Sequence, residues 1–521
     1  MAGTIYSLIP PVVAILMVIL TRRVLLSLGV GIVIGSLILN NFSIPETGQT
    51  VFESARAIFA GQNEDTGAWE LNTWNVYILL FLLLLGIMTA FISITGGSRA
   101  FGEWAQKRVK SRVGAQLVAI FLGIIIFIDD YFNALAVGQI SRPLTDRHRI
   151  SRAKLAYFID STSAPICVVS PISSWGAYII ALIGTILTAH SVTGISAFSA
   201  FVQMGPMNFY VIFAIILVFS VCLLDINIGP MKQHEERALK TGHVVDPDKN
   251  QIPGELKGDL PVSKKGNITD LVIPIAILVV ATISSMFYTG AKATEGNASL
   301  LAIFENTDVA TSLFYGGTIG VLVTILMFFR HQLGVKILAK GILEGIKSML
   351  PAVYILLFAW VIADIISMLE TGTYLAGIVE NSNMNIAFLP AILFIFSGVM
   401  AFSTGTSWGT FGIMLPIAGD IAASTDITLL LPMLASVLAG SVFGDHCSPI
   451  SDTTILSSTG AGSHHIDHVM TQLPYAIISA LIAIVGYILL GLTNNVMIGM
   501  LGAVVAFIIA IIILKKSAIK V

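Results

Sequence analysis

Six aspartates lie within otherwise apolar stretches of this sequence, where a charged side chain needs a partner or a role. They are Asp129, Asp130, Asp160, Asp364, Asp445 and Asp452. A carboxylate at membrane depth costs at least about 2.5–3.5 kcal/mol. A single Asp has a structural explanation, because it can cap the exposed N–H groups where a helix breaks. The same stretches contain no Lys or Arg, so we expect six carboxylates together to take their balancing charge from solution, as Na⁺, H⁺ or both.

Hydroxyl side chains accompany these aspartates and widen the set of oxygen ligands. Na⁺ is a hard cation and favours oxygen from carboxylates, hydroxyls and backbone carbonyls. Burial favours the neutral form of a carboxylate, so H⁺ and Na⁺ can compete for one site. The candidate Na⁺ ligands among the aspartates are Asp129, Asp130, Asp160, Asp445 and Asp452. The accompanying hydroxyl residues are Ser161, Thr162, Ser163, Ser403, Thr404, Thr406, Ser407, Ser448, Ser451, Thr453 and Thr454.

Histidines near these positions have two different interpretations. His446 follows Asp445 directly and either tunes protonation there or donates to a backbone carbonyl where the helix breaks. Three more histidines, His464, His465 and His468, surround Asp467. They have no further carboxylate or Cys at metal-ligand spacing, and we interpret them as a cytoplasmic loop.

Two tryptophans occupy matching places in the two halves of the chain. Trp175 follows Pro-Ile-Ser-Ser and Trp408 follows Thr-Ser. They are candidates for the wall of a binding site. Interfacial Trp is also a common structural feature of membrane proteins, and that alternative stays open.

The composition of the 521-residue chain places it in the membrane. Its residues are 55% hydrophobic and 11% charged, whereas soluble proteins carry about 25% charged residues. The net charge of −2 gives no field that would recruit nucleic acid. Three scattered cysteines, Cys167, Cys222 and Cys447, are too few for a disulfide framework or a zinc site. Soluble enzymes and secreted scaffolds are excluded, and we expect a polytopic α-helical membrane protein that is not an enzyme and needs no cofactor.

Apolar runs long enough to span a bilayer recur along the whole chain. A spanning helix needs about 20 apolar residues. Two longer stretches, 155–189 and 429–462, are interrupted by Pro, Ser, Asp and Gly, so we expect them to be broken helices. With these two, the scheme has eleven spans. The uninterrupted runs are 5–21, 24–42, 76–95, 207–225, 269–289, 311–329, 350–369, 470–492 and 497–514.

The distribution of Lys and Arg predicts the orientation of these spans. Arg22 and Arg23 place the first turn in the cytoplasm and the N-terminus outside, and the final span brings Lys515 to the cytoplasm. The stretch 114–141 has basic residues at both ends, which predicts a re-entrant hairpin opening inward with its midpoint at Ile128 to Tyr131. The stretch 387–419 has acidic residues at both ends, which predicts a second hairpin opening outward.

Short sequence matches indicate an internal repeat. Val76-Tyr77-Ile78-Leu79-Leu80-Phe81 recurs at 353–358, and Asp160 to Pro165 resembles Asp445 to Pro449. Each repeat has five spans, so the two copies are inverted, as in secondary transporters with broken helices. The predicted organisation is a first repeat at 1–225, a cytoplasmic linker at 226–268, a second repeat at 269–495 and an extra C-terminal transmembrane helix at 496–521.

Three motifs resemble the NhaC-type Na⁺/H⁺ antiporter family of the ion transporter superfamily. They are Phe127-Ile128-Asp129-Asp130-Tyr131-Phe132-Asn133 with Arg142-Pro143, Asp160 to Pro165, and Gly444 to Thr453. The first motif adds Asn133 to the candidate binding residues. The resemblance implies a secondary transporter of the bacterial inner membrane with a scaffold and a mobile unit. It also implies a homodimer, as in many related carriers.

Two functions follow as hypotheses, and the expected partners are the lipid bilayer and Na⁺. The first is Na⁺/H⁺ exchange by alternating access, indicated by surplus carboxylates without fixed positive charge. The second is cation-coupled transport of an amino acid or small carboxylate, which the hydroxyl-rich breaks and paired tryptophans would suit. A channel is less favoured, because a pore does not need two hairpins that open in opposite directions.

Overall fold

The computed structural model is almost entirely helical, as expected for a chain that must satisfy its backbone hydrogen bonds within lipid. It describes residues 1–21, 23–62, 67–127, 129–171, 173–249, 262–263, 265–294, 299–371, 374, 377 and 385–518. Arg22 and Ile128, which entered the orientation and hairpin predictions, lie outside the described residues. So do residues 63–66, the part of the linker at 250–261, and the end of the chain at 519–521.

The elements of the first half precede a long linker helix. Strands β1 and β2 pair antiparallel, with Ala60 opposite Leu71. Helix α13 (Gly229–Thr241) begins the linker. The elements before it are η1 (Ile5–Leu8), α1 (Ile9–Thr21), α2 (Val24–Leu39), α3 (Ile44–Ala57), β1 (Ala60–Gln62), β2 (Trp69–Leu71), α4 (Thr73–Ile94), α5 (Gly97–Arg108), α6 (Arg112–Ile125), α7 (Asp130–Arg147), α8 (Arg152–Thr162), α9 (Ala164–Cys167), α10 (Ser174–Ala189), α11 (Ala197–Met204), η2 (Gly205–Met207) and α12 (Phe209–Leu224).

The second half contains most of the long membrane helices. Its elements are α14 (Thr269–Ala293), α15 (Leu300–Glu305), α16 (Val309–Arg330), α17 (Val335–Met368), η3 (Ile386–Phe388), α19 (Leu389–Thr404), α20 (Ser407–Thr425), η4 (Ile427–Leu429), α21 (Leu430–Cys447), α22 (Asp452–Ala461), α23 (His465–Thr493) and α24 (Val496–Ala518). Among the described residues, nine helices are long and apolar enough to cross a membrane. The chain is therefore a multi-pass membrane protein. Shorter apolar helices occur at Ile5–Met17, Leu25–Leu39, Arg112–Ile125 and Tyr178–Ala189.

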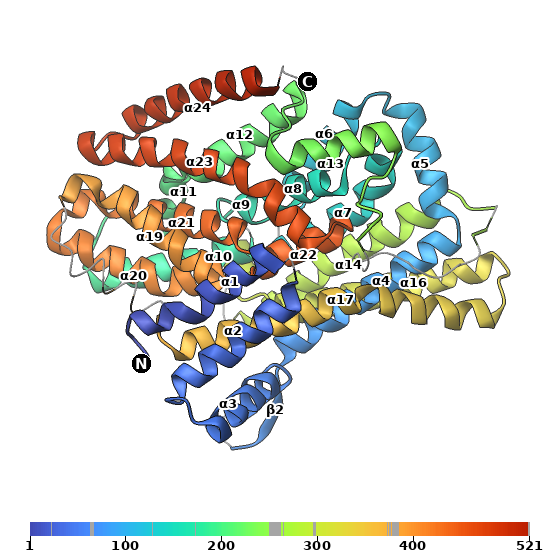
Figure 1. The fold of residues 1–521 in the computed structure, drawn as a ribbon, viewed down its shortest axis with the longest axis horizontal. Coiled ribbons are helices and arrows are strands. Elements are labelled where there is room, and N and C mark those ends of the chain that lie inside the picture. Colours follow the sequence, from blue (N-terminus) through green and yellow to red (C-terminus); the bar gives the residue numbers. More distant parts are fainter. Residues whose placement is uncertain are drawn as a thin grey trace.

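Both large hydrophobic cores combine residues from the two halves of the chain. One joins α10, α11 and α12 to α19, α20, α21 and α23. The other joins α4, α7 and α8 to α14, α16, α17 and α22. In Figure 1, α7, α8 and α22 lie near the middle of the molecule, between α23 and α24 on one side and α1 to α3 on the other. Neither half therefore builds these cores without the other.

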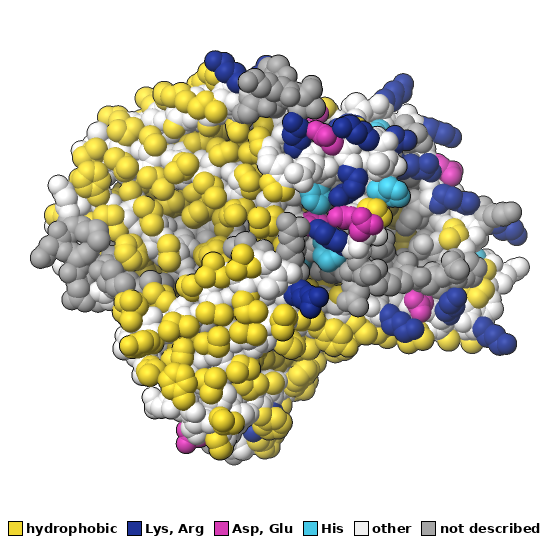
Figure 2. Space-filling model, viewed as in Figure 1, with side chains coloured by type: hydrophobic (Ala, Val, Ile, Leu, Met, Phe, Trp, Pro, Cys, Tyr) yellow, Lys and Arg dark blue, Asp and Glu magenta, His cyan; other side chains and the backbone are white. Residues whose placement is uncertain are grey.

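The surface separates into an apolar region and a basic end. In Figure 2, hydrophobic side chains cover the region of α19, α20, α21 and α24 and of α1 to α3. Lys and Arg side chains gather at the opposite end, where α5 and the turn between α16 and α17 lie. This distribution is typical of a protein whose apolar belt faces lipid and whose basic end faces water.

The linker helix α13 is fixed to the membrane helices by buried ion pairs. Glu235, on α13, has a side chain only 2% exposed and accepts from Arg112 Nη2 at 2.6 Å. It also accepts from the Ser151 backbone N–H at 2.7 Å and pairs with Lys154 Nζ at 3.4 Å. The side chain of Lys154 is fully buried and also donates to Asn227 at 2.9 Å. One carboxylate thus joins α6, α8 and α13.

Two glycines bring helices from the two halves into backbone contact. Gly138 lies on α7 and Gly460 on α22, and a Cβ added at either position would overlap a backbone carbonyl of the other helix. Small residues allow this close approach in membrane helix packing.

We expect Gly138→Ala to destabilise the protein by about 1–3 kcal/mol, because the new methyl group forces the two backbones apart. The control is Gly48→Ala on α3, where a Cβ would meet nothing within 4 Å. That substitution should stabilise by about 0.5–1 kcal/mol, since Ala is the better helix former. Thermal unfolding in detergent measures both changes, and equal shifts for the two variants would contradict the close packing.

Candidate functional site

Four interruptions of helical structure contact one another inside the protein. They fall between α6 and α7, between α8 and α9 at Ser163, between α19 and α20 at Gly405, and between α21 and α22. Ser448 Oγ donates to the Phe402 carbonyl at 2.8 Å, which joins the last two interruptions. Asn133 Nδ2 donates to the carbonyls of Gly123 at 2.5 Å and Ile126 at 2.6 Å, and satisfies the end of α6. These interruptions carry most of the aspartates described below.

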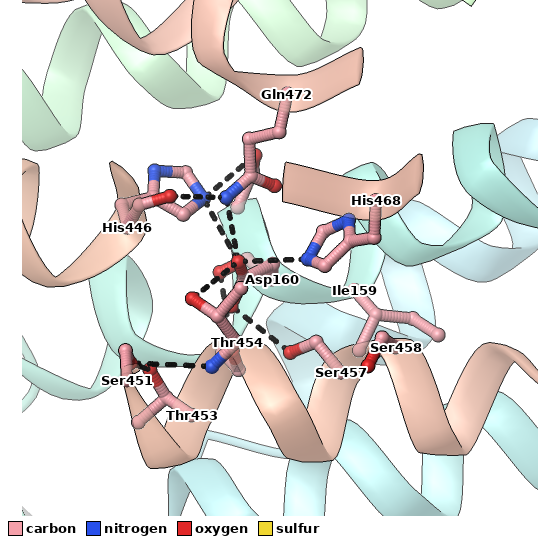
Figure 3. A network of polar contacts seen from close by, with 12 residues as sticks. Ile159, Asp160, His446, Ser451, Thr453, Thr454, Ser457, Ser458, His468 and Gln472 are labelled. Atoms are coloured by element: carbon pink, nitrogen blue, oxygen red, sulfur yellow. Dashed lines mark hydrogen bonds and ion pairs between the residues drawn. The ribbon is translucent and has the colours of Figure 1, made fainter. Parts of the chain in front are cut away.

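Asp160, on α8, is the most highly coordinated of these aspartates. Its carboxylate accepts from Gln472 Nε2 at 2.6 Å, and His468 Nε2 lies 3.1 Å away. Ser457 donates at 2.9 Å and Thr454 at 3.3 Å. Figure 3 shows these side chains converging on Asp160 from α22 and α23. Asp160 is 1% exposed, so its charge is stabilised by protein donors in place of water.

His446 extends this network toward α12. Its Nε2 lies 3.7 Å from Asp160 and 3.3 Å from Ser161 Oγ, and its Nδ1 lies 2.8 Å from Tyr210 Oη. Gln472 also donates to the His446 carbonyl at 2.6 Å. The ring is therefore held by side chains from α8 and α12, and it faces the carboxylate of Asp160.

Asp445, next to His446, has one satisfied and one unsatisfied oxygen. Its Oδ2 accepts from Ser407 at 2.9 Å and from Thr453 at 3.4 Å, and Ser451 lies beside the carboxylate. Its Oδ1 is buried and makes no hydrogen bond within the described part of the chain. This oxygen is available to a proton or a cation.

Asp130, at the start of α7, shows the same asymmetry. Its Oδ1 accepts from Trp175 Nε1 at 2.9 Å, whereas its Oδ2 is buried without a hydrogen bond among the described residues. The neighbouring Asp129 caps α7 by accepting from the Phe132 N–H at 2.9 Å. Tyr131 Oη donates to Asp452, which also accepts from the Thr453 N–H at 2.8 Å.

The buried aspartates form a chain through the protein. Asp130 is close enough to Asp129 and Asp452 for their charges to interact, and Asp445 interacts in the same way with Asp452 and Asp160. The polar partners given above for Asp130, Asp160, Asp445 and Asp452 include no Lys or Arg. Within the described residues, no group of three or more His, Cys, Asp or Glu is arranged to hold one metal ion. The carboxylates thus lie in sequence and do not surround a single point.

Some predicted hydroxyl residues stabilise their own helices and do not contact a carboxylate. Thr162 donates to the Phe158 carbonyl at 2.7 Å, and Thr404 donates to the Met400 carbonyl at 2.9 Å. Ser163 donates to the Asp160 carbonyl at 3.1 Å. Ser403 is buried, and the Thr406 carbonyl accepts from Thr410 at 3.0 Å. Among the described residues of the sequence set, Ser407, Thr453 and Thr454 bond to an aspartate side chain, and Ser451 lies beside Asp445.

The aromatic residues form a cluster beside Asp130. The Trp175 ring makes an edge contact with Trp408, at 6.0 Å between ring centroids. Trp408 stacks on Tyr178 at 4.7 Å. Trp175 is fully buried and its indole N–H bonds to the carboxylate, so it is a direct neighbour of the aspartate chain. Asp364, by contrast, is half-buried on α17 and belongs to none of these contacts.

The interpretation of the histidine cluster as a cytoplasmic loop is wrong for two of its members. His465 begins α23 and is buried, with Nε2 at 2.7 Å from the Pro449 carbonyl. His468 is fully buried against Asp160. Sequence reasoning also missed Ser457, Gln472 and Tyr210. A signal was present, because His468 and Gln472 are spaced four residues apart and share one helix face.

Comparison with known proteins connects this chain to a family of secondary transporters. The model of the Na⁺/H⁺ antiporter family matches residues 166–492. An uncharacterized protein of Haemophilus influenzae is 47% identical over 99% of this chain and 96% of its own length. The malate-2H⁺/Na⁺-lactate antiporter of Bacillus subtilis is 31% identical over 36% of this chain and 39% of its own length. An uncharacterized Na⁺/H⁺ antiporter of Haemophilus influenzae is 38% identical over 17% of this chain and 20% of its own length.

Proposed function

Because this chain belongs to the Na⁺/H⁺ antiporter family, we propose that it exchanges Na⁺ for H⁺ across the bacterial inner membrane by alternating access. The family match supports a secondary transporter of this type. The assignment of Na⁺ and H⁺ as the exchanged ions rests on two buried carboxylate oxygens, Asp130 Oδ2 and Asp445 Oδ1. Neither oxygen has a hydrogen-bond partner among the described residues. Leaving a buried charged group unsatisfied is costly. A proton or a Na⁺ ion removes that cost, and the two then compete for the same oxygens.

The surroundings of Asp445 support Na⁺ as one of the two cargoes. Ser407 and Thr453 already contact its other oxygen. Hydroxyl and backbone carbonyl oxygens at the interruptions, together with one or two carboxylates, form the kind of ligand set that a hard cation favours. Asp160 differs, because protein donors already satisfy it. We assign Asp160 and His446 to stabilising the site and Asp130, Asp445 and Asp452 to binding the exchanged ions.

The membrane arrangement belongs to the same proposal. It has inverted repeats at 1–225 and 269–495, re-entrant hairpins at 114–141 and 387–419, an external N-terminus and a cytoplasmic C-terminus, and the protein is a homodimer. Cores shared between the two halves support the pairing of repeats. The basic end in Figure 2 supports a single cytoplasmic side.

Na⁺-driven proton movement in proteoliposomes tests the function. The purified protein is reconstituted with a pH-sensitive dye inside the vesicles and no organic solute on either side. External Na⁺ should then raise the internal pH as H⁺ leaves, and K⁺ at the same concentration should not. Absence of a Na⁺-dependent pH change would reject the exchange.

Coupled transport of an organic solute is the second candidate. The Bacillus subtilis relative is an antiporter of malate and lactate by its name. In this chain, the aromatic cluster of Trp175, Tyr178 and Trp408 beside Asp130 would suit a small organic molecule. Uptake of labelled malate, lactate or an amino acid driven by a Na⁺ gradient, without Na⁺/H⁺ exchange in its absence, would favour this candidate.

A further inference from the structure

A polar cavity lies at the ends of two membrane helices, away from the aspartate chain. Its volume is ≈ 230 Å³, and it is lined by Lys265, Asn267, Asp270, Arg330, His331 and Gln332. These residues come from the start of α14, the segment before it and the end of α16. None of them contacts an aspartate of the candidate transport site.

One oxygen of the only carboxylate named in the lining already has two partners. Asp270 is 3% exposed, and its Oδ2 accepts from the Asn267 backbone N–H at 2.8 Å. The same oxygen lies 3.1 Å from His331 Nε2, and His331 Nδ1 lies 3.1 Å from Ser263 Oγ. Asp270 Oδ2 therefore holds the cavity wall together by joining His331 to the segment before α14.

The charge left at the cavity is positive. Lys265 and Arg330 are exposed, and no ion pair of their side chains occurs among the described residues. Two cations against the single carboxylate of Asp270 leave a net positive charge. The side-chain amides of Asn267 and Gln332 add N–H donors. Clustered N–H donors with a positive charge are the chemistry that recognises a phosphate group.

The cavity lies where two helices that can span a membrane begin and end, which is where phospholipid head groups are expected. Arg330 ends α16 and Thr269 begins α14, and both helices are apolar enough to span the membrane. Exposed apolar residues of α16 that precede Arg330 are spaced three or four positions apart. This spacing places them on one face of the helix, where they form an apolar stripe. The stripe consists of Tyr315, Ile319, Leu322, Leu326 and Phe329, exposed by 43%, 42%, 56%, 68% and 50%.

We propose that this cavity binds the phosphate of an anionic phospholipid, with Lys265 and Arg330 contacting the head group and the acyl chains lying along the stripe on α16. Basic pockets between membrane helices on the cytoplasmic side are sites of this kind. The bound lipid would also hold the linker. Ser263 Oγ contacts His331, and the Ser263 backbone bonds to Ile94 at 2.8 Å and to Arg99 at 3.2 Å.

Lipid binding to the detergent-purified full chain tests this assignment. Native mass spectrometry with added phosphatidylglycerol should show a bound lipid, and phosphatidylcholine should bind much more weakly. The double variant Lys265→Gln/Arg330→Gln should lose about 30-fold in affinity for phosphatidylglycerol, at about 1 kcal/mol per basic residue near the membrane surface. The control Lys232→Gln/Lys240→Gln removes the same charge from α13 and should bind like the wild type.

Three results would overturn the proposal. Equal lipid affinity in the two double variants would place the binding elsewhere. Displacement of phosphatidylglycerol by millimolar inorganic phosphate would identify a site for a soluble anion. Loss of the wild-type thermal transition in the Lys265→Gln/Arg330→Gln protein without lipid would show that these side chains support the fold. All three readouts are independent of Na⁺/H⁺ exchange, so they do not depend on the proposed function.

Discussion

Asp445→Asn and Asp130→Asn should each abolish measurable Na⁺/H⁺ exchange while the protein still inserts into the membrane. Asparagine keeps the size of the side chain and removes the charge that attracts Na⁺ and the oxygen that takes up H⁺. A hydrogen bond to a charged group contributes about 1.5–3 kcal/mol, which corresponds to about 10- to 100-fold weaker ion binding. Because H⁺ uptake is lost as well, the exchange cycle cannot be completed. The measurement is the Na⁺-dependent pH change in proteoliposomes.

An exposed aspartate supplies the control for these variants. The side chain of Asp420 is 71% exposed and faces His190, so Asp420→Asn should exchange normally. Wild-type exchange in both Asp130→Asn and Asp445→Asn would show that these two carboxylates do not bind the exchanged ions. Asp129→Asn is informative in a different way, because Asn caps helices as well as Asp does. Loss of transport in this variant would therefore show that the charge of Asp129 is needed, and retained transport would show that Asp129 only caps α7.

Glu235→Ala should destabilise the protein by about 3–5 kcal/mol, the cost of leaving buried charges without their partner. The fully buried Lys154 would keep only Asp225, at 3.3 Å, and Asn227. Arg112 would lose its 2.6 Å contact, and the Ser151 N–H would lose its acceptor. Thermal unfolding of the purified protein in detergent measures the loss.

The neighbouring residue provides a matched control. Glu236 pairs with Lys232 and Lys240 on the partly exposed side of α13, where ion pairs contribute about 0–1 kcal/mol. Glu236→Ala should therefore leave the unfolding temperature nearly unchanged. Similar shifts in the two variants would show that the linker helix does not depend on its buried carboxylate.

Local sequence patterns were sufficient to predict the membrane class and the buried aspartates. Asp130, Asp160 and Asp445 stand out because they interrupt apolar segments, and a helix that breaks exposes backbone groups wherever it lies in the fold. Ser407 and Thr454 were found in the same way, since they occur beside the interruptions. These features depend on short stretches of chain and on the low polarity of lipid.

The partners of these aspartates were harder to predict. His468 and Gln472 follow Asp160 by 308 and 312 residues in the sequence, and no local pattern reports contacts over that separation. The polar first turn of α23 looks like a loop because the apolar run begins after it. Inside the protein, the same turn is buried because Asp160 and the Pro449 carbonyl satisfy its histidines.

Charge counting has a similar limit. Arg152 and Lys154 are among the basic residues that follow the stretch 114–141 and predict its cytoplasmic side. In the structure, Arg152 makes two parallel bonds to Asp146 at 3.2 and 3.0 Å and reaches the Gly462 carbonyl at 3.3 Å. Lys cannot reproduce that planar geometry. The count predicts a side of the membrane and says nothing about the contacts each residue makes.

The contact between Asp160 and Gln472 has a consequence for how the protein is made. A ribosome adds about 5–20 residues per second, so Gln472 follows Asp160 by about 15–60 seconds. During that interval the nascent chain holds Asp160 without His468, Gln472 or Ser457. An ionised Asp160 is therefore costly in lipid until α22 and α23 have been synthesised and supply its partners.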